Sequence, residues 1–113
     1  LWHSTRLGLN ESQISKLKIL RTNFKKARIM NRARIRITRL DLKAAIRTDP
    51  MNMKEIEKLV KKRTSQRKIM WMSIINAIAK TKMILTSKQL EEIRKIIKTK
   101  RMRRIKYRRK KGI

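Results

Sequence analysis

The sequence predicts an all-α fold, namely a three-helix bundle with a long basic first helix and a basic C-terminal extension. Its 113 residues include only 2 glycines and 1 proline, too few for a β-rich or low-complexity chain. Apolar residues recur at steps of three and four along most of the chain, which is the spacing of one face of an α-helix. The length allows one domain at most, and 40% hydrophobic residues are enough for a modest core.

The first helix is expected over residues 11–47. Asn10 and Gln13 have the spacing of an N-terminal capping box, and Thr48-Asp49-Pro50 ends the helical pattern. Within this helix, nine basic residues follow one another at a mean step of about 3.6, so they line one side of it over roughly 44 Å. These nine residues, called the basic rail below, are Lys18, Arg21, Lys25, Arg28, Arg32, Arg36, Arg39, Lys43 and Arg47.

The basic rail favours a polyanionic partner. Asp41 is the only acidic residue between Lys16 and Arg47, so the helix repels itself until a partner neutralises it. A short charged run is usually just a solvated face, but this one continues for about eight helical turns. Most rail residues are arginines, and guanidinium groups bind phosphate in a bidentate way that suits a structured nucleic-acid surface.

Two apolar stripes run along the same helix. The first lies about 110° from the rail and has Asn31 and Thr38 as small polar gaps. Its apolar members are Leu17, Leu20, Phe24, Ala27, Ile35, Leu42 and Ala45. The second stripe comprises Met30, Ala33, Ile37, Leu40 and Ala44. A helix with two apolar sides needs two packing partners, so two further helices should cover it.

The second helix is expected to start with Asp49 as its cap and Pro50 in its first turn, with Asn52 and Glu55 as a competing capping box. It should close at Lys80-Thr81-Lys82. Arg63 and Arg67 fall where its apolar stripe should continue. Either the helix breaks near Thr64-Ser65 or its middle section projects beyond the bundle, and the sequence leaves both options open.

The third helix is expected to start at the capping box formed by Thr86 and Gln89. Residues 101–111 are either an extension of this helix or an arm that becomes ordered only on a polyanion. The domain organisation is therefore an N-terminal extension (1–10), a three-helix bundle (11–100) and a basic tail (101–113). The residues predicted to share one core are Ile35, Leu42, Ile74, Ile78, Ile93 and Ile97.

The composition argues against an enzyme. Lys and Arg number 35 against 7 acidic residues, giving a net charge of +28. Basic residues contribute to this charge in every predicted helix. His3 is the only histidine, and Glu91 and Glu92 point about 100° apart, so no acid–base pair is expected. Without cysteine, neither disulfides nor thiolate metal sites are available. We therefore expect no catalytic residue, metal, cofactor or small-molecule substrate.

Nucleic-acid contacts are expected beyond the basic rail as well. Trp71 could stack on a base, although its spacing from Ile74 and Ile78 favours a place in the core. For Tyr107, a stacking role and an idle one are equally compatible with its basic surroundings. The further predicted RNA-binding residues are Arg63, Arg67, Arg101, Arg103, Arg104, Tyr107, Arg108 and Arg109.

Several segments resemble the bacterial-type small-subunit ribosomal protein S-twenty family. Lys25-Lys26-Ala27-Arg28 through Asn31-Arg32-Ala33 is similar to the family's basic segment, and Lys43-Ala44-Ala45-Ile46 before Asp49 is similar to the end of its first helix. Ile78-Ala79-Lys80 followed by Met83-Ile84 resembles its second turn. The resemblance covers roughly residues 25–104. It implies a three-helix bundle whose long first helix lies along ribosomal RNA of the small subunit.

The chain departs from the family pattern at its second turn. The family's glycine, histidine and asparagine are replaced by Lys82, Leu85 and Ser87, and the segment between the turns is longer. These departures favour an organellar form, with the mitochondrial matrix as the expected compartment and the cytoplasm if the protein is bacterial. The acid-free start, Leu1 to Arg6, is what a cleaved organellar presequence could leave, and a disordered N-terminus is the alternative.

The sequence thus predicts a structural, non-enzymatic protein that binds small-subunit ribosomal RNA, with neighbouring ribosomal proteins as further potential partners. The alternatives are a different ribosomal or ribonucleoprotein component and a DNA-compacting nucleoid protein. A helix lying on a membrane surface is disfavoured, because the first apolar stripe is interrupted and has no aromatic residue beyond Phe24. The longest apolar stretch, residues 69–79, is also shorter than the about 18 residues of a membrane span.

Overall fold

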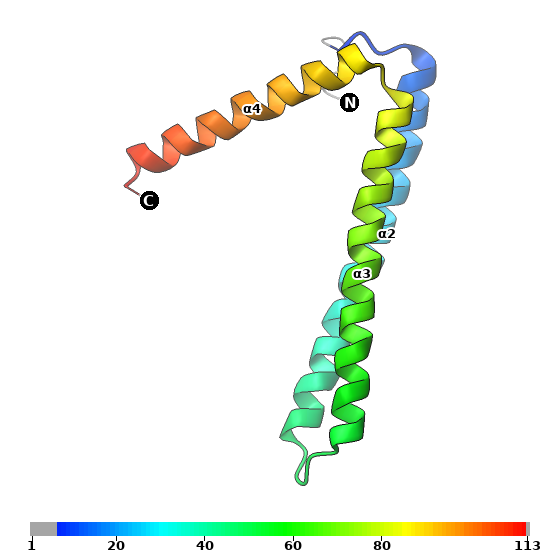
Figure 1. Ribbon diagram of the computed structural model, residues 1–113, viewed down its shortest axis with the longest axis vertical. Helices are drawn as coiled ribbons and strands as arrows, with labels where there is room; N and C mark the ends of the chain where they lie inside the picture. Colours follow the sequence, from blue (N-terminus) through cyan, green and yellow to red (C-terminus); the bar gives the residue numbers. More distant parts are fainter. Residues whose placement is uncertain (1–6, 113) are drawn as a thin grey trace. The chain divides into compact units, whose positions relative to one another are not determined.

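The computed structural model describes residues 7–112 and contains three helices in this range (Figure 1). Helix α2 spans Glu11–Arg47, α3 spans Met53–Ile84 and α4 spans Ser87–Lys110. No strand occurs among the described residues, so the predicted all-α class with three helices is confirmed. The prediction about Leu1 to Arg6 lies outside the described residues.

The chain divides into two compact units. The first, called the hairpin below, is Ile19–Lys80 and holds most of α2 and α3. The second, called the junction, consists of the described residues within Leu1–Lys18 and Thr81–Ile113, including all of α4. The two units are described separately.

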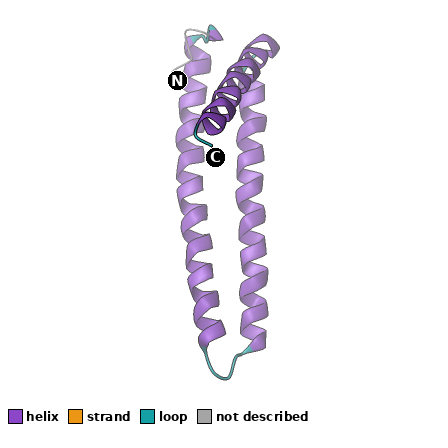
Figure 2. Cartoon of the chain, turned by 90° about the vertical axis from the view of Figure 1, so that its left-hand side faces the viewer, coloured by secondary structure: helices purple, strands orange, loops and turns teal. Residues whose placement is uncertain are grey.

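In the hairpin, α2 and α3 run antiparallel and side by side, joined by the loop at residues 48–52 (Figure 2). The buried and half-buried positions of α2 are those of the first predicted stripe, with Asn31 and Thr38 included. On α3 the corresponding positions advance by alternating steps of three and four, as in a coiled-coil seam. They are Ile56, Leu59, Arg63, Gln66, Met70, Ser73 and Ala77, and Ile74 beside them is also half-buried.

The polar residues at the buried positions of α2 and α3 do not interrupt the packing between these helices. Thr38 is fully buried, and its Oγ1 donates a hydrogen bond of 3.1 Å to the carbonyl oxygen of Arg34, one turn earlier. Asn31 is also buried, whereas Arg63 is half-buried on the seam of α3. Helix α3 passes through Thr64-Ser65 without a break, and Arg63 and Gln66 are half-buried on its seam, so neither the predicted break nor the projecting middle section is found.

The second predicted stripe of α2 stays uncovered in the hairpin. Ile37 and Leu40 are both more than half exposed, because α3 covers only one side of α2. The prediction of one shared core is wrong at Ile78, 50% exposed, and at Ile97, 59% exposed. Each lies beside the buried stripe of its helix and not on it.

The helix boundaries follow the capping residues with two corrections. Helix α2 begins after Asn10 and ends at Arg47, as predicted. Helix α3 begins at Met53 and not at Pro50, because the chain uses residues 48–52 to reverse direction and Asn52 Oδ1 then accepts from the Glu55 amide at 3.3 Å. It also continues past Lys80-Thr81-Lys82 to Ile84, where Leu85 N still donates to Thr81 O at 3.1 Å.

The junction is organised by two capping boxes. Asn10 and Gln13 exchange hydrogen bonds of 2.8 and 3.0 Å at the start of α2, and Thr86 and Gln89 exchange bonds of 3.2 and 2.9 Å at the start of α4. The two glutamines also bond each other, since Gln13 Nε2 donates to Gln89 Oε1 at 2.8 Å and Gln89 Nε2 donates to Gln13 Oε1 at 3.2 Å. The two helix starts are therefore tied together directly.

The same glutamines also satisfy backbone carbonyls around them. Gln13 Nε2 reaches Ile84 O at 3.1 Å, and Gln89 Nε2 reaches Leu7 O at 3.2 Å and Gly8 O at 3.3 Å. Gln89 is buried, and so are Leu85 and Ile96 close by in the chain. From this start α4 runs without interruption to Lys110, so residues 101–110 extend the helix and do not form a separate irregular arm.

Candidate nucleic-acid interface

The basic rail is fully available at the surface of α2. All nine rail residues are exposed, and none of them forms an ion pair or a side-chain hydrogen bond with another described residue. The rail lies beside the buried stripe of α2, so packing against α3 fixes the direction in which it points. A straight helix packed in this way presents the cations as a row with one-turn spacing, which matches a repeating phosphate backbone better than a flexible arm does.

The rail borders α3 over its middle section. Arg28 and Arg32 line a small hollow of about 60 Å³ together with residues of the seam and of α3. The remaining lining residues are Phe24, Asn31, Met70, Ser73 and Ile74. The stems of these two arginines thus lie against the hairpin seam, which restricts their motion while the exposed side chains keep the charge in solvent.

Helix α3 adds an apolar and aromatic surface on the rail side. Trp71 precedes Ile74 by three residues and Ile78 follows Ile74 by four, so the three lie along one side of α3, and Ile74 lines the hollow with Arg28 and Arg32. Trp71 is 63% exposed, so the preference for a place in the core is wrong. The hairpin seam takes Met70 and Ser73 instead, leaving Trp71 off the buried stripe.

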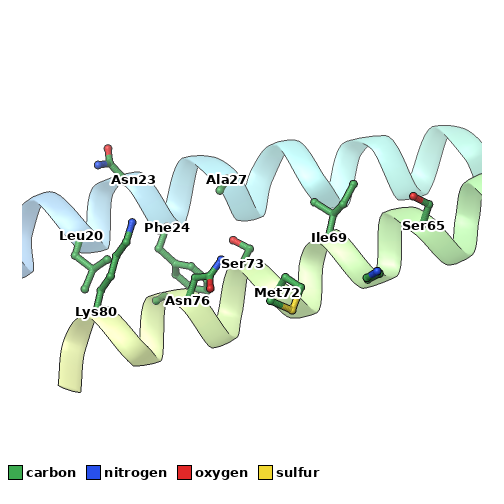
Figure 3. Close-up of a pocket in the computed structure, with 12 residues that line it drawn as sticks. Leu20, Asn23, Phe24, Ala27, Ser65, Ile69, Met72, Ser73, Asn76 and Lys80 are labelled. Carbon is green, nitrogen blue, oxygen red and sulfur yellow. The ribbon is translucent and has the colours of Figure 1, made fainter. Parts of the chain in front are cut away.

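The opposite side of the hairpin is different in character. A groove of about 630 Å³ runs between α2 and α3 there, and Figure 3 shows its lining from both helices. Leu20, Phe24 and Ala27 line it from α2, and Ile69 and Met72 are among the residues that line it from α3. Lys68 and Lys80 of α3 also line the groove, but no rail residue does, so the basic rail and this groove lie on different sides of the seam.

The other predicted site residues divide between the two units. Arg67 is exposed on α3, one turn before Trp71. Arg63 is different, because it is half-buried and its Nε finds no hydrogen-bond partner within the described part of the chain. The rest belong to α4 in the junction and are all exposed: Arg101, Arg103, Arg104, Tyr107, Arg108 and Arg109.

The cations of α4 do not form a rail. Arg101, Arg104 and Arg108 follow one face, but Arg103 and Arg109 point elsewhere around the helix. The last turn carries Arg108, Arg109 and Lys110, which suit the negative end of the helix dipole. Lys111 Nζ lies 5.7 Å from the centre of the Tyr107 ring, so this aromatic ring already has a cation next to it.

Comparison of the chain with family models, with curated proteins and with solved structures gives no match. Among residues 7–112, no group of three or more His, Cys, Asp or Glu side chains is placed to hold a metal ion. None of the helices in that range combines the length and apolar character needed to cross a membrane. The geometry itself defines a helical hairpin that carries a row of exposed cations along one side of α2.

The sequence identified the cations but not their neighbours. The hollow that Arg28 and Arg32 line together with Met70 and Ile74 depends on how α2 and α3 align, which composition does not give. One signal was present, because the steps of three and four through Arg63, Gln66, Met70 and Ser73 define the α3 seam as a heptad pattern. Following that pattern through the arginine would have placed Trp71 outside the seam.

Proposed function

We propose that this protein is a structural RNA-binding component of the small ribosomal subunit, holding ribosomal RNA helices through the basic rail of α2. The observation that carries the proposal is the exposure of all nine unpaired rail cations along one side of a packed helix. Each cation that neutralises a phosphate releases a condensed counterion, so such a row gains affinity in proportion to its length. The resemblance of residues 25–104 to the S-twenty family supports ribosomal RNA as the particular polyanion.

The pairing of α2 with α3 supports a structural role. A helix packed along one seam presents its cations in a regular row, so phosphates at a matching spacing suit it best. The basic residues at the end of α4 are distributed around the helix and not along one face. Such a distribution suits a segment that is surrounded by RNA on several sides, as in a large ribonucleoprotein particle.

A DNA-compacting nucleoid protein is the second candidate, because double-stranded DNA offers the same phosphates. The rail would serve it equally well, but the exposed Trp71 is on a flat helical face and not at a tip where it could wedge between stacked base pairs. Preference for RNA over DNA of the same sequence, measured at equal ionic strength, separates the two candidates.

The direct experiment is co-sedimentation of the purified chain with separated small and large ribosomal subunits at moderate salt. We expect the chain to travel with small subunits and to be released progressively as salt rises. Equal recovery with both subunits, or stronger binding to DNA than to either, would contradict the proposal.

The rail is tested by two triple variants of equal formal charge. Replacing Arg28, Arg32 and Arg36 by glutamine should weaken RNA binding at every salt concentration and flatten the slope of log affinity against log salt by roughly two units. The matched control replaces Lys16, Lys26 and Arg34, which are also exposed but lie off the rail. Equal losses in both triples would mean that only net charge matters and that the rail has no special role.

A further inference from the structure

Trp71 is exposed and lies one turn before Ile74, which lines the same hollow as Arg28 and Arg32. Its exposed fraction of 63% leaves most of a large apolar ring in solvent, which is unfavourable without a partner. Ile75 and Ile78, one and two turns further along α3, are also about half exposed. The three side chains lie at positions i, i+4 and i+7, so they form an apolar strip along one side of α3, next to Ile74.

Positive charge surrounds this strip on two helices. Arg67 precedes Trp71 by four residues on α3 and is exposed. On α2, Arg28 and Arg32 border Ile74, which lies one turn after Trp71. A protein partner packing on Trp71 would have to place carboxylates over all three cations, whereas one nucleotide offers an aromatic base and phosphates together.

We propose that Trp71 stacks on an unpaired base of the bound RNA while Arg28, Arg32 and Arg67 hold the phosphates on either side of that base. The inference rests on the proposed function and narrows its partner to RNA in which a base is free to leave the helical stack. A perfectly paired duplex buries both faces of every internal base, so it can occupy the rail but not the ring of Trp71. A bulge, an internal loop or a helix end supplies the free base.

The test uses the full chain with Trp2→Phe, which leaves Trp71 as the only tryptophan and its fluorescence as a direct signal. Two RNA probes are compared, namely a fully paired hairpin stem capped by a stable tetraloop and the same stem with one bulged adenosine. We expect fluorescence quenching with the bulged stem and tighter binding of it. Trp71→Ala should weaken binding of the bulged stem about 5- to 100-fold and binding of the paired stem less than about twofold.

Two further variants show whether the ring itself is responsible. Trp71→Phe should keep most of the affinity, because a smaller ring still stacks. Met72→Ala is the matched control, since Met72 is 45% exposed on the same helix but lines the groove on the other side. Because Trp71 and Met72 both lie off the seam, neither alanine should reduce helicity measured by circular dichroism.

The outcomes separate the inference from the proposed function. If Trp71→Ala affects the bulged stem no more than Met72→Ala does, base stacking is wrong, even where the rail variants still show that RNA is bound. If the parent chain shows no salt-dependent binding to either stem, the proposed function fails first. If Trp71→Ala binds RNA normally but enters particles poorly once other proteins are present, the strip is a protein contact and the inference is wrong.

Discussion

The hairpin and the junction are stabilised by different kinds of contact. Along the hairpin seam, apolar side chains alternate with polar ones, and Arg63 Nε and Gln66 Oε1 are buried there without a hydrogen-bond partner among the described residues. In the junction, the side-chain amides of Gln13 and Gln89 bond to each other and donate hydrogen bonds to backbone carbonyl oxygens. The chain thus pairs its polar groups strictly where the starts of helices must be positioned. It tolerates unpaired polar groups in the seam, where packing only has to hold two long helices together.

The largest effect should come from placing a charge in the hairpin seam. Leu59 is buried there, so Leu59→Asp should lower the free energy of unfolding by about 3–5 kcal/mol and leave the free chain largely unfolded. Ile78→Asp is the control, because Ile78 lies off the seam and should cost less than about 1 kcal/mol. Urea titration followed by circular dichroism measures both. Similar losses in the two variants would show that the seam is misplaced.

The next effect is stabilisation by the polyanion. Folding and charge neutralisation are linked, so the free chain at low salt should be only partly helical. A rail-binding RNA at about 100 times its dissociation constant should add about 2.7 kcal/mol of stability. Amide hydrogen exchange should show the gain across residues 19–80. A free chain that melts cooperatively and independently of salt would contradict this expectation.

A matched pair of glutamine substitutions tests the comparison most directly. Gln89→Leu removes the donor to Leu7 O and Gly8 O and both bonds to Gln13, so it should cost about 1–3 kcal/mol. Gln66→Leu removes an acceptor that has no partner, so it should be neutral or stabilising by up to about 1 kcal/mol. Chemical denaturation gives both values. If the order were reversed, the contrast between the two units would be lost.

The smallest expected effects are at the helix caps. Thr86→Ala removes one half of a complete capping box and should cost about 1 kcal/mol, seen as faster amide exchange in the first turn of α4. Asn52→Ala removes a single, longer bond of 3.3 Å at the start of α3 and should cost less. An equal or greater loss at Asn52 would mean that the reciprocal box adds nothing over a single cap.

Sequence periodicity predicted the single-helix features well. Local spacing was enough to predict the nine rail positions, the first apolar stripe and both capping boxes of the junction. In a helix, the spacing between residues along the sequence determines on which face each side chain lies. Apolar character alone was a poorer guide. Met30, Ile37, Trp71 and Ile78 resemble core residues by type, yet each is at least half exposed, because two paired helices bury one stripe each.

Long-range contacts could not be predicted in the same way. Gln13 and Gln89 were both identified as capping residues, but nothing in their local sequence indicates that their amides meet. The reverse error occurred at Asn31, Thr38 and Arg63, which were taken as gaps or breaks in the stripes. Small or long-stemmed polar residues can occupy a seam when their polar atoms turn to their own backbone or reach towards solvent, as Thr38 does through its bond to Arg34 O.

The pairing of Gln13 with Gln89 also has a consequence for the order of folding. The loop at residues 48–52 brings the ends of α2 and α3 together across a short stretch of chain, so closing the hairpin from that end costs little loop entropy. The two glutamines are 76 positions apart, and their contact can form only after residue 89 has emerged. The hairpin and its rail can therefore form during synthesis, before the junction closes and fixes the start of α4.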